Sequence, residues 1–176
     1  MNNTPIVVLL TGLSGSGKTT LGNLVHNKLQ RLGYNSILLD GDTFREKYAP
    51  DLGFSKTDRA KNLEFAGSIA KEYIKSGIDI ILMSFIAPYS TDRIKLQKYI
   101  YPYRFKEVYL SSTLEVCEDR DVKGLYKKAR SGKIQNFTGI GDEYEIPTNP
   151  SLIIPTHEWD IERCVDSIFS TILDYD

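Results

Sequence analysis

GLSGSGKT, residues 12–19, is the stretch of this chain from which its fold can be inferred. It matches the pattern GxxxxGK[ST] in full and directly follows the apolar, strand-like run 6–10. A pattern of helical period begins after it, with one apolar face formed by Leu21, Leu24, Val25, Leu29 and Leu32. A strand, a glycine-rich loop and a helix in this order form an anion-binding site, because backbone N–H groups turn inward at the positive end of the helix dipole. The stretch therefore predicts a loop that holds a polyphosphate.

Two side chains of this loop carry the predicted chemistry. Lys18 is placed to reach the β- and γ-phosphates of a nucleotide, and the Thr19 hydroxyl is placed to bind Mg²⁺. The alternative is a turn rich in glycine and serine that fits the pattern by chance. Such a turn does not require the strand before it and the helix after it, so the flanking sequence favours the phosphate loop.

Length and composition indicate one domain, 1–176, without a membrane-spanning segment. The chain has 176 residues, 41% of them hydrophobic, and no apolar run approaches the ~20 residues that a span needs. Its N-terminal region lacks the basic flank and apolar stretch of a secretory signal. The formal net charge of −1 provides no general attraction to nucleic acid or anionic lipid. We therefore expect a cytoplasmic protein that binds neither nucleic acid nor membranes.

The cysteines and histidines show no metal-binding spacing. Cys117 and Cys164 both fall in helical patterns, and two buried, reduced thiols are a better interpretation than a disulfide in a cytosolic protein. His26 and His157 stand apart from each other and from both cysteines, so the sequence does not predict a zinc site.

Strand-like and helical runs alternate along the chain. The expected strands are 6–10, 36–39, 78–84, 105–110 and 151–154, and the later expected helices are 58–75, 91–99, 113–119 and 161–172. This alternation predicts a parallel sheet with helices on both faces, the closing helix packing through Ile161, Cys164, Val165, Ile168, Phe169 and Ile172. Ligands of such folds bind beyond the carboxyl ends of the strands. The segments 12–19, 40–45, 84–90 and the one after residue 110 are therefore expected to line the site.

Two carboxylates follow the second expected strand. Asp40 is the best-placed acid to hold metal-bound water or to accept the proton of an attacking hydroxyl, because the strand 78–84 ends without an acid. Asp42 precedes Thr-Phe-Arg-Glu and fits the N-cap of a helix. We therefore predict a functional role for Asp40 and leave Asp42 open.

A basic cluster lies in the segment 119–137, in a chain that is otherwise close to neutral. The cluster consists of Arg120, Lys123, Lys127, Lys128, Arg130 and Lys133. Beside a phosphate loop, such a segment is typical of a lid that stabilises transferring charge and excludes water. The alternative is the solvated face of a helix.

Four residues in polar surroundings allow two interpretations each. Phe54 and Phe137 either fill a small secondary core or stack on a base, and the core is the more common outcome. Arg59 and Asn62 share a helix face, from which they are able to bind a second phosphate or a sulfate.

Taken together, these segments resemble the adenylylsulfate kinase family. The matching stretches are GLSGSGKTT, LDGDTFR, DLGFSKTDRAKN, SFIAPYSTDR, CEDRDVKGLYKKARSGKIQNFTGI and YEIPTNPSL, in the order and spacing of the family. The resemblance implies a three-layer α/β P-loop fold with a five-stranded parallel sheet and a mobile lid over about residues 124–140. It also implies transfer of the γ-phosphate of ATP, with Mg²⁺, to the 3′-hydroxyl of adenosine 5′-phosphosulfate (APS), by a homodimer that works in sulfate assimilation.

The resemblance also implies roles for individual residues. The positions for ATP are Gly12, Ser14, Gly15, Ser16, Gly17, Lys18, Thr19, Thr20 and Arg120, with Arg120 against the adenine. The positions around APS are Asp40, Arg45, Phe54, Arg59, Asn62, Ile86, Ala87, Lys123 and Phe137, with the two phenylalanines on either side of the base. Thr19 and Asp40 are the expected Mg²⁺ ligands, and Lys18, Asp40 and Lys123 the expected catalytic residues.

The chain departs from the family pattern at four positions. Ala87 stands where the family has the serine of Ile-Ser-Pro, so phosphate is expected to pass directly from ATP to its acceptor. Ser84 is not expected to replace that serine, because strand alternation points residues 84 and 87 to opposite faces for as long as the strand continues. Glu64, Phe65 and Ser90 replace residues that are often basic in the family, which lowers the positive charge expected on the acceptor side.

These departures leave two alternatives open. The first is a kinase of the same fold that phosphorylates another nucleotide, such as cytidine diphosphoramidate. The second is a nucleotide-binding module without phosphotransfer, which the retained Lys18, Thr19, Asp40 and Lys123 disfavour.

Overall fold

Five parallel strands form the centre of the protein. The computed structural model describes residues 4–174. The strands are β1 (Ile6–Thr11), β2 (Ser36–Asp40), β3 (Ile80–Ser84), β4 (Arg104–Ser111) and β5 (Leu152–Pro155), in the spatial order β2-β3-β1-β4-β5. The helices are α1 (Lys18–Arg31), α2 (Gly41–Tyr48), α3 (Lys56–Lys75), α4 (Ser90–Ile100), α5 (Leu114–Arg120), α6 (Leu125–Arg130) and α7 (Ile161–Leu173). The predicted α/β fold with a five-stranded parallel sheet is confirmed.

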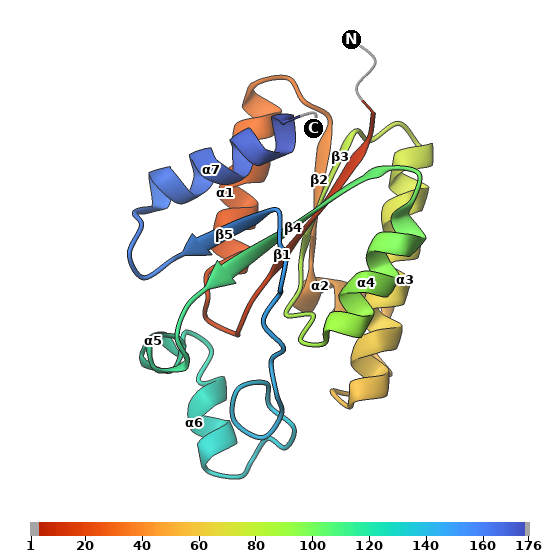
Figure 1. Ribbon diagram of the computed structural model, residues 1–176. Coiled ribbons are helices and arrows are strands. Elements are labelled where there is room, and N and C mark those ends of the chain that lie inside the picture. Colours follow the sequence, from red (N-terminus) through yellow and green to blue (C-terminus); the bar gives the residue numbers. More distant parts are fainter. Residues whose placement is uncertain (1–3, 175–176) are drawn as a thin grey trace.

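The sheet separates two apolar layers. Ile6, Val8 and Leu10 of β1 pack with residues of α1 and α7, whereas Val7 and Leu9 pack with residues of α3 and α4. Figure 1 shows α1 and α7 on one face of the sheet and α3 and α4 on the other. β1 is buried along its whole length because both of its faces are covered, which is why its sequence is continuously apolar.

Three apolar residues expected inside the helix layers are exposed. Leu32 is 57% exposed because it caps α1 after the last helical residue, and Ile161 is 59% exposed because it is the first residue of α7. Leu24 is 39% exposed, since α1 packs on the sheet through Leu21, Val25 and Leu29. The period was predicted correctly, but the width and the ends of the buried stripe were not.

Local capping moves or adds helices relative to the sequence prediction. α3 begins two residues before the expected start, because the Oγ of Ser55 accepts a hydrogen bond from the backbone N–H of Asp58 at 3.1 Å. For α2 the sequence indicated a possible start at Asp42 but no extent, and α6 was not predicted as a helix; they have only 8 and 6 residues. Helices of two turns or fewer carry too few apolar positions to show a period.

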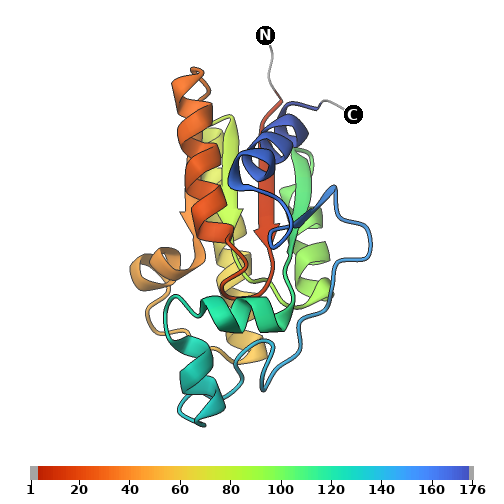
Figure 2. The ribbon, with the colours of Figure 1, turned by 90° about the vertical axis from the view of Figure 1, so that its left-hand side faces the viewer.

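The predicted lid is a separate small layer. α6 and the loop after it lie beyond the carboxyl ends of the strands, next to α5 (Figures 1 and 2). Their own apolar cluster contains Cys117, Tyr126, Ala129 and Phe137. Cys117 and Cys164 are buried free thiols, as expected. Among residues 4–174, no helix is both long and apolar enough to cross a bilayer.

Candidate active site

The phosphate loop connects β1 to α1 in a conformation that requires glycine. Gly12 has φ +150° and Gly15 has φ +77°, values that side chains disfavour. A Cβ on Gly12 would lie 2.7 Å from the carbonyl oxygen of Leu110, and one on Gly15 would lie 3.0 Å from that of Cys117. The loop is therefore packed closely against β4 and α5, which leaves no room for a side chain at either glycine.

Lys18 lies at the first position of α1 and is buried. Its ammonium group donates to the carbonyl oxygens of Gly12 at 2.9 Å and Leu13 at 2.7 Å. Burial lowers the pKa of Lys18 to about 8, and the negative charges of Asp42 and Asp40 offset part of this effect. The loop thus holds a desolvated cation whose charged form a polyphosphate would favour.

Asp40 connects the phosphate loop to α2. Its Oδ2 accepts a hydrogen bond from the Thr19 hydroxyl at 2.6 Å, and its Oδ1 accepts one from the backbone N–H of Asp42 at 3.2 Å. Asp40 is therefore the N-cap of α2, which settles the role of Asp42 that the sequence left open: Asp42 lies inside the first turn of the helix. The helix begins one residue after the strand ends, which leaves the cap to the last strand residue. Asp42 instead forms an ion pair with Lys123 from the segment before α6.

Thr19 and Asp40 fit a magnesium site. They present a hydroxyl and a carboxylate oxygen beside the phosphate loop, and hard oxygen ligands are what Mg²⁺ prefers. Among residues 4–174 there is no group of three or more His, Cys, Asp or Glu side chains that could hold a metal alone. Mg²⁺ in nucleotide sites takes few protein ligands and completes its shell with phosphates and water, so two protein oxygens suffice.

Arg120 and Thr156 support the phosphate loop from outside. Arg120 donates to the carbonyl oxygen of Gly15 at 3.2 Å and to that of Thr156 at 2.9 Å, and the Thr156 hydroxyl donates to Ser16 at 3.0 Å. Tyr126 of α6 donates to the carbonyl oxygen of Ser14 at 2.9 Å. Sequence reasoning missed Thr156 and Tyr126. Thr156 follows the last strand directly, so the rule of strand carboxyl ends, applied to that strand, would have found it.

Arg45, Phe54 and Arg59 form a second group next to the lid. The guanidinium carbons of Arg45 and Arg59 lie 4.7 and 5.6 Å from the ring centroid of Phe54, which is 55% exposed. Arg59 also donates to the carbonyl oxygen of Asn136 at 3.3 Å. This group therefore combines two cations with an accessible aromatic face, and it touches the main chain of the lid.

Asn62 and Phe137 are less accessible than the resemblance implies. Asn62 is 4% exposed, and its Oδ1 has no hydrogen-bond partner among residues 4–174. The Phe137 ring packs edge-on against Tyr126 at 4.9 Å and is 7% exposed. Packing of a base between Phe54 and Phe137 stays a prediction.

The main chain at Ile86 and Ala87 is held in an unusual conformation. The Thr11 hydroxyl donates to the carbonyl oxygen of Ile86 at 2.6 Å, and Ala87 has φ +45°. β3 ends at Ser84, as expected, so strand alternation does not extend to residue 87 and does not decide which way that residue faces. Ser84 is nonetheless 3% exposed, which makes it a poor candidate for the missing serine.

The other departures from the family pattern have partners in the fold. Glu64 lines a groove between α3 and α4 together with Asp92, Lys95 and Tyr99. The Phe65 ring packs edge-on against Phe44 of α2 at 5.8 Å. Phe65 is therefore partly covered by α2, whereas Glu64 is an exposed residue of α3 for which the structure gives no packing reason.

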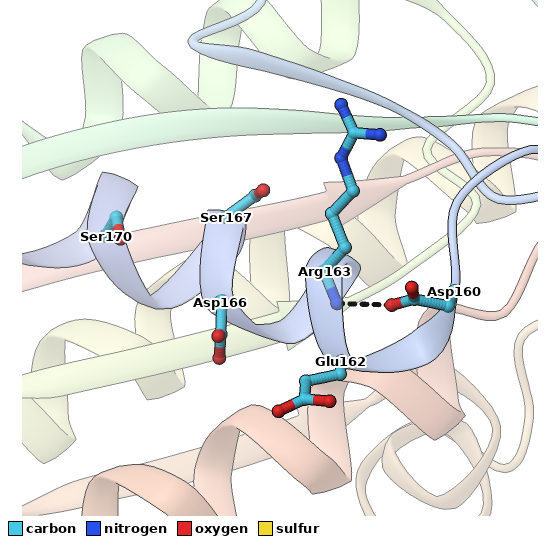
Figure 3. Close-up of a pocket in the computed structure, with 6 residues that line it drawn as sticks. All are labelled: Asp160, Glu162, Arg163, Asp166, Ser167 and Ser170. Carbon is cyan, nitrogen blue, oxygen red and sulfur yellow. Dashed lines mark hydrogen bonds between the residues drawn. The ribbon is translucent and has the colours of Figure 1, made fainter.

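A hollow on α7 has none of these features. It is lined by Asp160, Glu162, Arg163, Asp166, Ser167 and Ser170 (Figure 3). One of the lining carboxylates, that of Asp160, caps α7 by accepting from the backbone N–H of Arg163 at 2.7 Å. The hollow shares no residue with the phosphate loop, and its charges are those of an exposed helix.

The fold and the loop define a class. The protein has a parallel sheet, a glycine loop, a buried lysine at the start of the first helix and a hydroxyl–carboxylate pair beside it. These features define it as a P-loop phosphotransferase that uses ATP. The model of the family "Adenylylsulphate kinase" matches residues 4–155. The chain belongs to the adenylylsulphate kinase family.

Relatives and solved structures agree over almost the whole chain. The adenylyl-sulfate kinase of Prochlorococcus marinus is 43% identical over 96% of this chain and 84% of the relative, and that of Vibrio parahaemolyticus is 45% identical over 92% and 78%. The APS kinase of Mycobacterium tuberculosis, solved in complex with AMPPNP and APS, superimposes with a TM-score of 0.93 at 37% identity and covers 97% of this chain and 99% of that one. A hexameric APS kinase from Thiobacillus denitrificans superimposes with a TM-score of 0.72 at 28% identity, and the match covers 97% of this chain and 29% of that one.

Proposed function

We propose that this protein transfers the γ-phosphate of ATP to the 3′-hydroxyl of APS and so forms 3′-phosphoadenosine 5′-phosphosulfate in sulfate assimilation. The observation that carries the proposal is the contact of Thr19 with Asp40 beside the buried Lys18. These contacts bring together an ammonium group, a hydroxyl and a carboxylate at one end of the sheet, which supports their proposed use as cation, metal ligands and base. The superposition on a kinase solved with AMPPNP and APS supports the choice of both substrates.

The donor side is built from main-chain N–H groups and one ammonium group. When ATP binds, Lys18 exchanges the carbonyl oxygens of Gly12 and Leu13 for phosphate oxygens, and its charge stabilises the transferring group. Thr19 and Asp40 would hold Mg²⁺, which when bound neutralises charge on the β- and γ-phosphates. Arg120, bonded to Gly15 and Thr156, borders the adenine side.

The acceptor side is built from Arg45, Phe54, Arg59, Asn62, Ile86, Ala87 and Phe137. The arginines around Phe54 suit an anionic nucleotide, because the ring stacks on a base while the guanidinium groups neutralise phosphate or sulfate. The Oδ1 of buried Asn62, which has no hydrogen-bond partner in the described part of the chain, is available to a hydroxyl or amine donor of the acceptor.

The phosphoryl group passes directly from ATP to the acceptor hydroxyl. The acceptor oxygen forms a bond to the γ-phosphorus, the bond from that phosphorus to the β–γ bridging oxygen breaks, and ADP leaves with that electron pair. The proton of the attacking hydroxyl goes to the Asp40 carboxylate. Because position 87 is alanine, no serine ester forms there.

The lid is proposed to close over about residues 124–140. In this structure Lys123 is paired with Asp42 rather than with the phosphate loop. On closure Lys123 would leave Asp42 for the transferring phosphate, which adds a second cation where charge develops.

A coupled ADP-release assay tests the proposal. We expect turnover with ATP and APS, and loss of turnover without APS. Turnover confined to cytidine diphosphoramidate would overturn the choice of acceptor. Tight ATP binding with no ADP release for either acceptor would overturn the enzyme assignment in favour of a binding module.

We further propose a cytoplasmic homodimer, as the resemblance implies. Sedimentation equilibrium measures the mass independently of shape: a particle of twice 19.9 kDa is expected, and a monomer at all concentrations would contradict this.

A further inference from the structure

Arg93 of α4 lies inside the protein, with its guanidinium group bonded to three separate segments. It is 3% exposed. Nη1 donates to the carbonyl oxygen of Ala87 at 2.8 Å, Nη2 donates to that of Glu145 at 2.8 Å, and Nε pairs with the carboxylate of Glu107 on β4 at 2.6 Å. Burying a cation costs free energy unless it is paired and hydrogen-bonded. The position of the Arg93 guanidinium is therefore determined by these three contacts together.

The segment that Arg93 holds contains a strained residue. Ala87 has φ +45°, a left-handed conformation that a residue with a side chain adopts only when its surroundings enforce it. The residue before it is held as well, since the carbonyl oxygen of Ile86 accepts from Thr11, whose hydroxyl also bonds the Tyr144 hydroxyl at 2.9 Å. At Ala87 itself, the Arg93 guanidinium donates a hydrogen bond to the backbone carbonyl oxygen.

The third segment joins the end of the lid to the same unit. The backbone N–H of Glu145 donates to the carbonyl oxygen of Pro88 at 2.8 Å. Its carboxylate accepts from the backbone N–H of Ser90 at 2.7 Å. The Tyr89 hydroxyl donates to Asp142. Residues 86–90 and 142–145 are therefore joined by hydrogen bonds into one unit. Arg93 donates a hydrogen bond to each of the two segments, to Ala87 in the first and to Glu145 in the second.

We propose that Arg93 is a positioning residue for the acceptor nucleotide. Its guanidinium group holds the main chain of Ala87 in the left-handed conformation and so sets where Ile86 and Ala87 meet the acceptor. The proposal rests on the proposed function, because that function places residues 86 and 87 against the acceptor. Arg93 itself touches neither substrate and acts only through the main chain it bonds.

The variant Arg93→Lys tests this, because lysine keeps the charge opposite Glu107 but lacks the fork that reaches Ala87 and Glu145 together. We expect the KM for APS to rise about tenfold, the effect of losing one buried charge-assisted hydrogen bond. The KM for ATP is expected to stay within about twofold, because the phosphate loop makes no contact with Arg93. Arg163→Lys is the matched control: Arg163 lies on α7, its guanidinium carbon is 3.9 Å from the ring centroid of Trp159 just before that helix, and neither KM should change.

A second substitution separates positioning from general stability. Glycine adopts positive φ without strain. Ala87→Gly in the Arg93→Lys background is therefore expected to restore at least a third of the lost affinity for APS. A loss caused only by a weakened core would not be restored by a smaller residue in the loop. An unchanged KM for APS in Arg93→Lys, an equal rise for both substrates, or no recovery in the double variant would each overturn the proposal.

Hydrogen exchange gives a readout that does not need turnover. In Arg93→Lys the hydrogen-bonded backbone amides of Phe85, Ser90 and Glu145 should exchange at least tenfold faster, while those of α1 keep their native rates. Unchanged exchange at these amides overturns the inference even if the wild type proves inactive with APS. Inactive wild type with faster exchange in the variant overturns only the proposed function.

Discussion

Replacing Lys18 by methionine separates the contribution of its ammonium group to catalysis from its contribution to folding. Methionine is similar in length and apolar, so it fills the buried position without a charge. In the wild type the ammonium is surrounded by the carbonyl oxygens of Gly12 and Leu13 and is removed from water. We expect the variant to lose turnover by about 10²–10³-fold or more, because the cation aimed at the transferring phosphate is absent.

The effect on stability follows from the lowered pKa. A pKa of about 8 in the fold against a model value of 10.5 corresponds to a burial penalty of roughly 3 kcal/mol for the charged form at pH 7. Removing the charge removes this penalty but leaves two carbonyl oxygens without a donor, at about 1–3 kcal/mol for each. The two effects oppose each other, so Lys18→Met is expected to unfold within about 2 kcal/mol of the wild type at pH 7.

The pH dependence is the sharper measurement. Between pH 8 and pH 10.5 the unfolded chain binds a proton at Lys18 that the folded chain has released, so the free energy of unfolding rises with pH in this window. For this one group the rise from pH 7 to pH 9 is roughly 1.3 kcal/mol. Urea unfolding of the wild type and of Lys18→Met at pH 7, 8 and 9 gives the difference in their free energies of unfolding. The contributions of the other titrating groups cancel in this difference.

Two results would refute the reasoning. A difference in unfolding free energy between wild type and variant that is flat from pH 7 to pH 9 would mean that Lys18 is not desolvated. Wild-type turnover in Lys18→Met would mean that the ammonium does not act on the phosphate. Calorimetric titration of the wild type with an ATP analogue at pH 8.5, in buffers of different ionisation enthalpy, should show proton uptake, because phosphate favours the charged form.

Three further substitutions test other parts of the site. Asp40→Asn should lose turnover by about 10²-fold or more yet keep the cap of α2, whereas Asp40→Ala should also lose about 1 kcal/mol of stability; equal activity in Asp40→Asn and the wild type would exclude the base role. Ala87→Ser should change kcat less than about twofold, and a serine phosphoester detected by mass spectrometry during turnover would contradict direct transfer. Phe54→Ala should raise the KM for APS by about tenfold with little change in melting temperature, because its ring is mostly exposed; an unchanged KM would remove the ring from the acceptor site.

Several features of the fold and site were predictable because they depend on local sequence. The phosphate loop follows from glycines at fixed spacing between a strand and a helix, and the parallel sheet follows from alternating periods. Asp40 was found because parallel strands end at one edge of the sheet, so a carboxylate in that position must face the loop. The family motifs then gave the assignment that the comparisons confirm.

Other features depend on contacts between segments far apart in sequence. Nothing in the residues around Lys123 indicates that it pairs with Asp42, or that Thr156 bonds Ser16 across 140 positions. Which of the two carboxylates caps α2 depended on the exact end of β2, and the structure assigns the cap to Asp40. These pairings depend on the relative positions of helices, strands and loops to within about one hydrogen-bond length, which local sequence does not specify.

The sequence by itself determined the layer architecture, the anion-binding loop and the family, because backbone propensity and periodicity act over a few residues. Only the tertiary structure decided the left-handed Ala87, the buried Arg93 that bonds three segments, and the burial that lowers the pKa of Lys18. The physical reason is that desolvation and buried hydrogen bonds are set by all the atoms around a group, and most of those atoms come from distant parts of the chain.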